Sequence, residues 1–243
     1  MRDTRPFSDA PRAAWAAFGL LLGVQVTLAL TRPARAPAAD DLPPPPRPAI
    51  LRAGALGEHA AFARLAMLHL QAFDLSGGNT MPYRNLDYAR LVGWLRAIRD
   101  IDPRSDYPLF AAARVYAENP DPARSRLALD FVHESFLLDP DRRWPWLAHA
   151  ALLAKHRLRD LPLARQYASD IARLTHDPKL PDWARQMEVF ILEDMGEVAA
   201  ARVLLGAMLA GGRIHDPAER RYLEHHLREL ESRAGPGGTP GKR

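Results

Sequence analysis

Two adjacent carboxylates, Glu193 and Asp194, are the residues of this chain best suited to acid–base chemistry. Glycoside hydrolases work with a pair of carboxyl groups, so one hypothesis is an exported helical enzyme that acts on cell-wall glycan. However, adjacent acids at a helix end before a glycine commonly face solvent, and no second acidic motif accompanies them. The sequence also has no glycine-rich phosphate loop with a lysine, no dinucleotide fingerprint, no His-Glu-x-x-His and no Gly-x-Ser-x-Gly. We therefore expect no enzyme activity, no cofactor and no small-molecule substrate.

Histidine pairs are the second candidate, because imidazole is a common zinc ligand. His225 and His226 are adjacent, about 100° apart on a helix, and cannot both face one ion, so we expect both to be solvated. His149 and His156 share a helix face, but two histidines without a third ligand seldom bind zinc. Cysteine is absent, which removes thiolate ligands, thiol nucleophiles and disulfides. The expectation is no metal site.

Exposed aromatic and arginine side chains are the usual anchors of protein–protein recognition, and the sequence offers them in two places. Trp144 and Trp146 lie where a helix is expected to begin, and such tryptophans either pack between repeats or line a binding surface. Tyr83 and Arg84 lie in a loop with glycines and a proline, longer than the usual helix–helix connection, which is either a contact loop or a plain connector. We predict that these four residues contribute to one surface for a protein partner, whose identity the sequence does not reveal.

The distribution of charge argues against nucleic acid as a partner. The 243-residue chain has a net charge of +4. The positive excess lies at its ends: residues 1–52 carry +3 and residues 233–243 carry +3, whereas residues 53–232 carry 23 basic and 25 acidic side chains. A nucleic-acid-binding protein concentrates positive charge on its folded surface. We therefore expect no nucleic-acid partner.

The elements that must position these residues follow from a repeat of about 36 residues. Small or apolar residues recur in it at positions i, i+4 and i+7, the spacing of one stripe on an α-helix. The stripe residues are Ala128, Val132 and Ser135, then Ala164, Ala168 and Ile171, then Ala200, Leu204 and Ala207. An apolar run and a short break precede each triplet, so each unit is expected to be a helix, a tight turn and a second helix.

Ala128, Val132, Ser135 and Pro140 match the tetratricopeptide repeat at four positions: a small residue that opens helix B, an apolar residue four on, another three on, and a closing proline. The chain resembles this family over residues 57–211, although the Leu-Gly and Tyr of the family's helix A are absent. The resemblance implies an all-α fold, a right-handed superhelix of helical hairpins whose groove binds a peptide or helix of a partner protein. The alternative is an all-α domain whose regular spacing is accidental.

About four hairpins and a capping helix are expected in the repeat domain, residues 53–232. The hairpins occupy residues 57–98, 107–139, 144–175 and 182–211. Asp216-Pro217-Ala218-Glu219 then begins a final helix, with Asp as the N-cap, Pro in first position and Glu three residues after the cap. Its many charged residues suit a helix that covers the last apolar face of a stack of repeats. Residues 233–243 have the composition of a disordered tail.

An apolar segment, residues 13–31, precedes this domain and follows a short basic N-terminus, residues 1–12. Ala13 to Leu30 is uncharged and would span about 27 Å as a helix, close to the ~30 Å hydrocarbon core of a bilayer. We expect an uncleaved transmembrane anchor; the rival is a signal peptide cleaved near Ala36-Pro37-Ala38. Three arginines before the span against two after it favour an exported body.

A proline-rich linker, residues 32–52, is expected to hold the body away from the anchor as a semi-rigid spacer. The resulting hypothesis is a membrane-anchored, tetratricopeptide-like scaffold or adaptor for protein–protein interactions in a bacterial envelope complex. It would be a single-pass protein of the inner membrane with a periplasmic body. The alternative is an accessory subunit of an inner-membrane transporter or enzyme complex, whose membrane span forms part of the interface.

Overall fold

The structure is a computed structural model that describes residues 11–31, 42–73, 83–211, 214 and 216–234. Within these residues every regular element is a helix and none is a β-strand, which confirms the all-α class. Most of the short N-terminus, the first part of the linker, the loop before Tyr83 and the tail from residue 235 lie outside the described residues.

Eleven α-helices account for most of the described chain. They are α1 (Arg12–Thr31), α2 (Pro48–Gly54), α3 (His59–Ala72), α4 (Tyr88–Ile101), α5 (Tyr107–Arg114), α6 (Pro122–Leu138), α7 (Pro140–Leu153), α8 (Leu161–Leu174), α9 (Asp182–Asp194), α10 (Val198–Ala210) and α11 (Pro217–Ala234). Three short helical turns accompany them: η4 (Tyr83–Asn85), η5 (Tyr116–Glu118) and the π-helical η6 (Ala154–Leu158).

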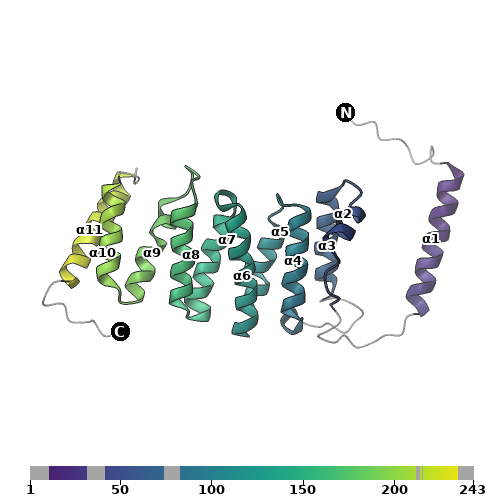
Figure 1. Cartoon of the computed structure of the whole chain (residues 1–243), viewed down its shortest axis with the longest axis horizontal. Coiled ribbons are helices and arrows are strands. Elements are labelled where there is room, and N and C mark those ends of the chain that lie inside the picture. The colour runs from purple at the N-terminus through teal and green to yellow at the C-terminus, as the bar shows by residue number, and fades with distance from the viewer. Residues whose placement is uncertain (1–10, 32–41, 74–82, 212–213, 215, 235–243) are drawn as a thin grey trace.

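Consecutive helices pack as four hairpins, α3–α4, α5–α6, α7–α8 and α9–α10, and α11 packs on α10. The hairpins stand side by side in chain order along the length of the body (Figure 1). We call α3, α5, α7 and α9 the A helices and α4, α6, α8 and α10 the B helices. The third hairpin begins at Pro140 and not at Trp144, because α7 follows α6 with only Asp139 between them. The right-handed superhelical sense stays a prediction.

The small-residue stripe is buried as expected in two of the B helices. All six stripe residues of α6 and α8 are fully buried: Ala128, Val132, Ser135, Ala164, Ala168 and Ile171. In α10 the expected register is wrong by one residue, because Ala201 and Leu205 are fully buried while Ala200 is half-buried and Ala207 is exposed. The turn at Gly196, whose φ is +78°, lets α10 begin 37 residues after α8, and Ala201 takes the place of its equivalent in α8.

The N-terminal side of the body differs from the spacer expected for residues 32–52. Residues 32–41 lie outside the described residues, but Leu42 and Leu51 belong to the main hydrophobic core, and α2 is a helix that the sequence analysis did not predict. Burial of a leucine side chain is worth about 1.5–3 kcal/mol. The two leucines therefore fasten this stretch to the body despite its prolines.

The C-terminal helix covers the last hairpin as expected. The carboxylate of Asp216 accepts a hydrogen bond from the backbone N–H of Ala218 at 2.9 Å, which confirms the predicted N-cap. Leu223 and Leu230 are buried in a cluster with residues of α9 and α10, while charged residues of α11 on the opposite side are exposed. The polar face thus ends the stack of apolar interfaces.

One described helix, α1, is long and apolar enough to cross a membrane, over Ala13–Thr31. The hydroxyl groups of Thr27 and Thr31 donate to the carbonyl oxygens of Gly23 and Thr27, at 2.8 and 2.9 Å. Hydroxyls that bond within their own helix need no partner in a bilayer. An anchor and a signal sequence both fit a helix of this kind near an N-terminus.

The burial of the stripe predicts the effect of a bulky residue in it. Ala164→Leu is expected to lower the free energy of unfolding by about 1–3 kcal/mol, because the added side chain overpacks a fully buried site. Ala200→Leu is the matched control on α10, where the half-buried site should change stability by only about 0.5 kcal/mol. Urea denaturation followed by circular dichroism measures both, and equal losses would contradict the one-residue shift in α10.

Candidate partner-binding groove

The A helices α5, α7 and α9 border a groove of about 430 Å³. Four aromatic side chains from these three helices line it: Phe110, Trp144, Trp146 and Trp183. Phe110 is 44% exposed and Trp183 is 51% exposed, whereas the two tryptophans of α7 are half-buried. The groove therefore presents a large accessible aromatic area.

The aromatic rings also join the A helices to one another. The Phe110 and Trp146 rings lie 5.9 Å apart between centroids with an interplanar angle of 82°, and those of Trp144 and Trp183 lie 5.7 Å apart at 64°. Edge-to-face pairs of this kind contribute about 0.5–1.5 kcal/mol beyond the burial of their area. The same side chains thus brace the stack and remain accessible at the groove.

The spacing of the two α7 tryptophans explains how α7 makes aromatic contacts with both α5 and α9. Residues two apart on an α-helix point about 200° away from each other. Trp146 accordingly contacts Phe110 of α5, and Trp144 contacts Trp183 of α9. Both the packing role and the groove-lining role that the sequence left open apply to these tryptophans.

The polar groups of the groove include Arg114 and the imidazole ring of His149. The exposed Arg114 places Nη1 3.4 Å from His149 Nδ1. Burial, and after it the charge of Arg114, lowers the pKa of His149 below its usual value. The imidazole is therefore neutral near pH 7, and Arg114 is the cation that a bound segment would meet.

The other two predicted site residues, Tyr83 and Arg84, lie in η4 and do not line this groove. The half-buried Tyr83 packs on the hydrophobic core, with its ring centroid 6.3 Å from that of Tyr116. The exposed Arg84 offers its backbone carbonyl oxygen to Asn119 Nδ2 at 3.1 Å and to the guanidinium of Arg124. The structure thus brings together the two tryptophans of the predicted surface and places the other pair elsewhere.

The groove also contains residues outside the predicted set of four, chiefly Phe110, Arg114 and Trp183. A signal for two of them was present, because Phe110, Trp146 and Trp183 follow one another at intervals of 36 and 37 residues, the same intervals as the buried stripe. An aromatic residue at a fixed place in successive A helices marks one continuous surface. No comparable pattern pointed to Arg114.

The two carboxylates Glu193 and Asp194 contact side chains of different helical elements. Glu193 accepts a hydrogen bond from His226 Nε2 of α11 at 2.6 Å, and Asp194 pairs with Lys155 of η6. The expectation of a solvated His226 is wrong, because its side chain is largely buried and its ring stacks on Tyr222. Among the described residues no group of three His, Asp or Glu side chains is placed to hold a metal ion.

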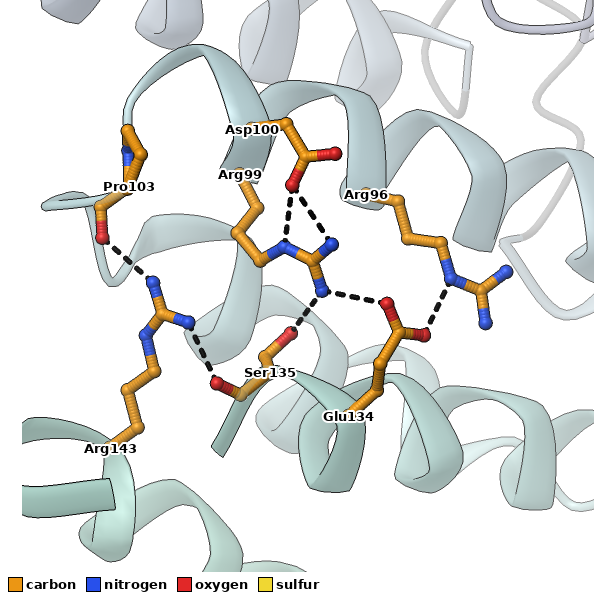
Figure 2. A network of polar contacts seen from close by, with 7 residues as sticks. All are labelled: Arg96, Arg99, Asp100, Pro103, Glu134, Ser135 and Arg143. Carbon is orange, nitrogen blue, oxygen red and sulfur yellow. Dashed lines mark hydrogen bonds and ion pairs between the residues drawn. The ribbon is translucent and has the colours of Figure 1, made fainter. Parts of the chain in front are cut away.

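A second polar cluster, around Arg143, joins three successive hairpins (Figure 2). Arg143 of α7 is only 2% exposed. Its guanidinium donates to the carbonyl oxygens of Ser135 and Pro103, both at 2.7 Å. These oxygens lie at or just beyond the C-terminal ends of α6 and α4, where carbonyls lack helical partners and carry partial negative charge.

Arg99 of α4 extends the same cluster (Figure 2). Its guanidinium pairs with Glu134 of α6 at 3.0 Å and with Asp100 at 2.9 Å, and it donates to the hydroxyl of Ser135 at 3.0 Å. Burial lowers the pKa of Arg143, and the remaining charges of the cluster are paired arginines and acids. We interpret this cluster as a structural link between successive hairpins, made of hydrogen bonds and ion pairs.

This polar cluster predicts that two adjacent arginines, Arg143 and Arg142, contribute unequally to stability. Arg143→Gln is expected to lower the free energy of unfolding by about 1–3 kcal/mol, since it leaves the buried carbonyl oxygen of Ser135 without its donor and removes one of the two donors to that of Pro103. The matched control is Arg142→Gln, because Arg142 also donates to Pro103 O, at 3.2 Å, but its side chain is 41% exposed. The control should cost at most about 1 kcal/mol. Thermal and urea denaturation measure the loss of stability in both variants. An equal loss in the two would contradict the importance of burial.

Comparison with protein-family models, with curated proteins and with solved structures finds no match to this chain. The class that the described residues establish is an all-helical protein of stacked hairpins, with one N-terminal helix apolar enough to span a membrane.

Proposed function

We propose that this protein is a membrane-anchored scaffold, similar to tetratricopeptide-repeat proteins, that binds a segment of a partner protein in its A-helix groove. The observation that carries the proposal is the set of four aromatic rings from three successive A helices in one accessible groove. Aromatic side chains supply most of the binding energy in many protein interfaces. The context we propose is a complex of the bacterial envelope, with the body on the periplasmic side of the inner membrane.

The groove chemistry supports a particular kind of ligand. Phe110 and Trp183 offer apolar area, and Arg114 offers an exposed cation beside it. A segment that combines aromatic, aliphatic or proline side chains with a carboxylate would satisfy both. Tyr83 and Arg84 stay in the proposal as a separate partner contact, outside the groove.

Photo-crosslinking in intact cells tests where the partner binds. A photoreactive amino acid in place of Leu152, which is 46% exposed and lines the groove, should capture the partner. The matched control is the same amino acid in place of Leu137, which is 49% exposed on α6 and does not line the groove. Equal crosslinking from both positions, or none from position 152, would contradict a groove-bound partner.

Removal of an exposed groove ring is expected to weaken binding more than stability. Trp183→Ala should weaken partner affinity roughly 30-fold if the ring is an interface hot spot. Its melting temperature should fall only slightly, because half of the side chain is already exposed and the lost ring pair with Trp144 contributes about 0.5–1.5 kcal/mol. By contrast, Tyr83→Ala should lower the melting temperature, since its ring packs on the core. Titration of the captured partner and thermal denaturation measure the two effects.

The second candidate function is that of an accessory subunit in an inner-membrane transporter or enzyme complex, and α1 favours it. Gly19, Gly23 and Thr27 lie four residues apart on one side of α1, and a Cβ at either glycine would meet no other atom within 4 Å. Small residues at this spacing allow close approach of helices within membranes. Replacing α1 by an unrelated apolar span would abolish assembly of such a subunit, whereas a scaffold that needs only an anchor would still function.

Membrane attachment itself is a prediction of the uncharged helix α1. The full-length chain should sediment with membranes and resist extraction by carbonate and by high salt. A chain recovered in the soluble fraction that begins near residue 39 would establish a cleaved signal peptide instead.

A further inference from the structure

The proline-rich segment 42–46 lies against α4 and is held by two side-chain donors. Arg90 Nη1 donates to the carbonyl oxygen of Leu42 at 3.0 Å, and Trp94 Nε1 donates to that of Pro43 at 2.8 Å. Arg90 and Trp94 are four residues apart and therefore share one face of the helix. Two successive carbonyls of the segment are thus bonded by one face of α4.

The sequence of the segment gives it the shape that these donors require. Each residue from Leu42 to Pro45 precedes a proline, which restricts it to extended or polyproline II backbone. A polyproline II helix has three residues per turn and no internal hydrogen bonds, so its carbonyls are free to accept. Leu42 is fully buried and Pro45, one turn later, is half-buried, whereas Pro43 and Pro44 between them are exposed.

Gly93 makes room for the segment on α4. A Cβ at this position would lie 3.0 Å from Cγ and 3.4 Å from Cδ of Pro45, and no other atom outside its own helix lies within 4 Å of it. Glycine in the middle of a helix is unfavourable because of its backbone entropy. At this site it admits the proline ring between the two donors.

We propose that the α4 surface formed by Arg90, Gly93 and Trp94 is a recognition site for proline-rich segments. Residues 42–46 occupy it in cis, and a proline-rich segment of another protein competes with them for it. An indole N–H that donates to the carbonyl of a polyproline II segment, together with a cavity for a proline ring, is how aromatic surfaces read such segments. This site is separate from the A-helix groove.

Replacement of residues 42–46 by a segment of another protein would increase the maximum distance between the helical body and the membrane. This consequence rests on the proposed membrane anchor. Ten residues separate Thr31 from Leu42, so the docked segment keeps these two points within about 40 Å of each other. With the segment released, the first fixed point is Pro48 in α2, and the limit rises to about 60 Å. The site therefore sets how far the body and its groove can stand from the bilayer.

A nitroxide at position 44 tests the proposal in the full-length protein. The chain has no cysteine, so Pro44→Cys provides a single labelling site on an exposed residue of the segment. The probe ligand is a synthetic peptide with the sequence of residues 41–48, and the control peptide has residues 43–46 replaced by Gly and Ser. A flexibly linked cis ligand acts at an effective concentration in the millimolar range, so half-release should need peptide at about that level.

Three variants make the test specific. Gly93→Leu should free the nitroxide without peptide, because its side chain occupies the place of Pro45. Trp94→Phe should free a larger fraction of the nitroxide without peptide than the wild type does, because the indole donor to Pro43 is lost. Gly206→Leu on α10 is the control, since a Cβ there meets no other atom within 4 Å. Circular dichroism confirms that each variant is folded.

An immobile nitroxide that the proline-rich peptide frees, and the control peptide does not, would support the proposal. A nitroxide that is mobile in the wild type, or that stays immobile with Gly93→Leu and with 10-fold more peptide than the millimolar level, would overturn it. The measurement is made in detergent solution without a partner. A negative result here is therefore distinct from a negative result for the other proposals. Carbonate extraction tests the membrane anchor, and photo-crosslinking tests the groove.

Discussion

The constraint on which the rest of the structure depends is that no hairpin can bury its small-residue stripe by itself. Alanine and serine side chains contribute little apolar area, so their burial requires the close approach of neighbouring backbones. Ala128 and Ser135 of α6 are fully buried only because hairpins stand on both sides of them. The line of hairpins in Figure 1 is the arrangement that meets this requirement for every unit, and α11 ends it with a polar outer face.

The two rows of helices meet this constraint with different chemistry. The B helices are joined by polar contacts between successive units, such as Arg126 to Asp160 at 3.1 Å and His133 to Asp170 at 2.8 Å. Partly exposed ion pairs add little stability, so their main effect is on the alignment of one unit with the next. The A helices are joined by edge-to-face aromatic pairs that leave ring surface accessible. A groove suited to recognition therefore forms on the A row.

The sequence predicted those parts of the fold that follow from local periodicity and capping. The stripes of α6 and α8, the number of hairpins and the N-cap at Asp216 depend on residues close together in the chain, and these predictions were confirmed. The shift in α10 was missed because one left-handed residue, Gly196, changes the interval between helices without disturbing the pattern within either. The burial of Leu42 was not predicted, because a proline-rich composition indicates an extended chain but does not indicate which helix that chain packs against.

The candidate site was predictable only in part, for a related reason. Trp144 and Trp146 stood out by residue type, and the recurrence of an aromatic residue in α5 and α9 follows the repeat interval. The hydrogen bond between Glu193 and His226 joins residues 33 positions apart in helices that meet only in the folded chain. Contacts between distant residues leave no pattern in the local sequence. The sequence therefore predicted, from residue type alone, that both side chains face solvent.

The two aromatic surfaces of the body differ in what they offer a ligand. On α4, Trp94 engages its segment through the indole N–H, and with Arg90 it bonds backbone carbonyls, which every sequence possesses. Selectivity there must come from the polyproline II shape that fits beside Gly93. The A-helix groove offers the accessible rings of Phe110 and Trp183 and the charge of Arg114. We therefore expect selectivity in the proposed groove to depend on the side chains and charge of the ligand, so the two surfaces would suit different segments.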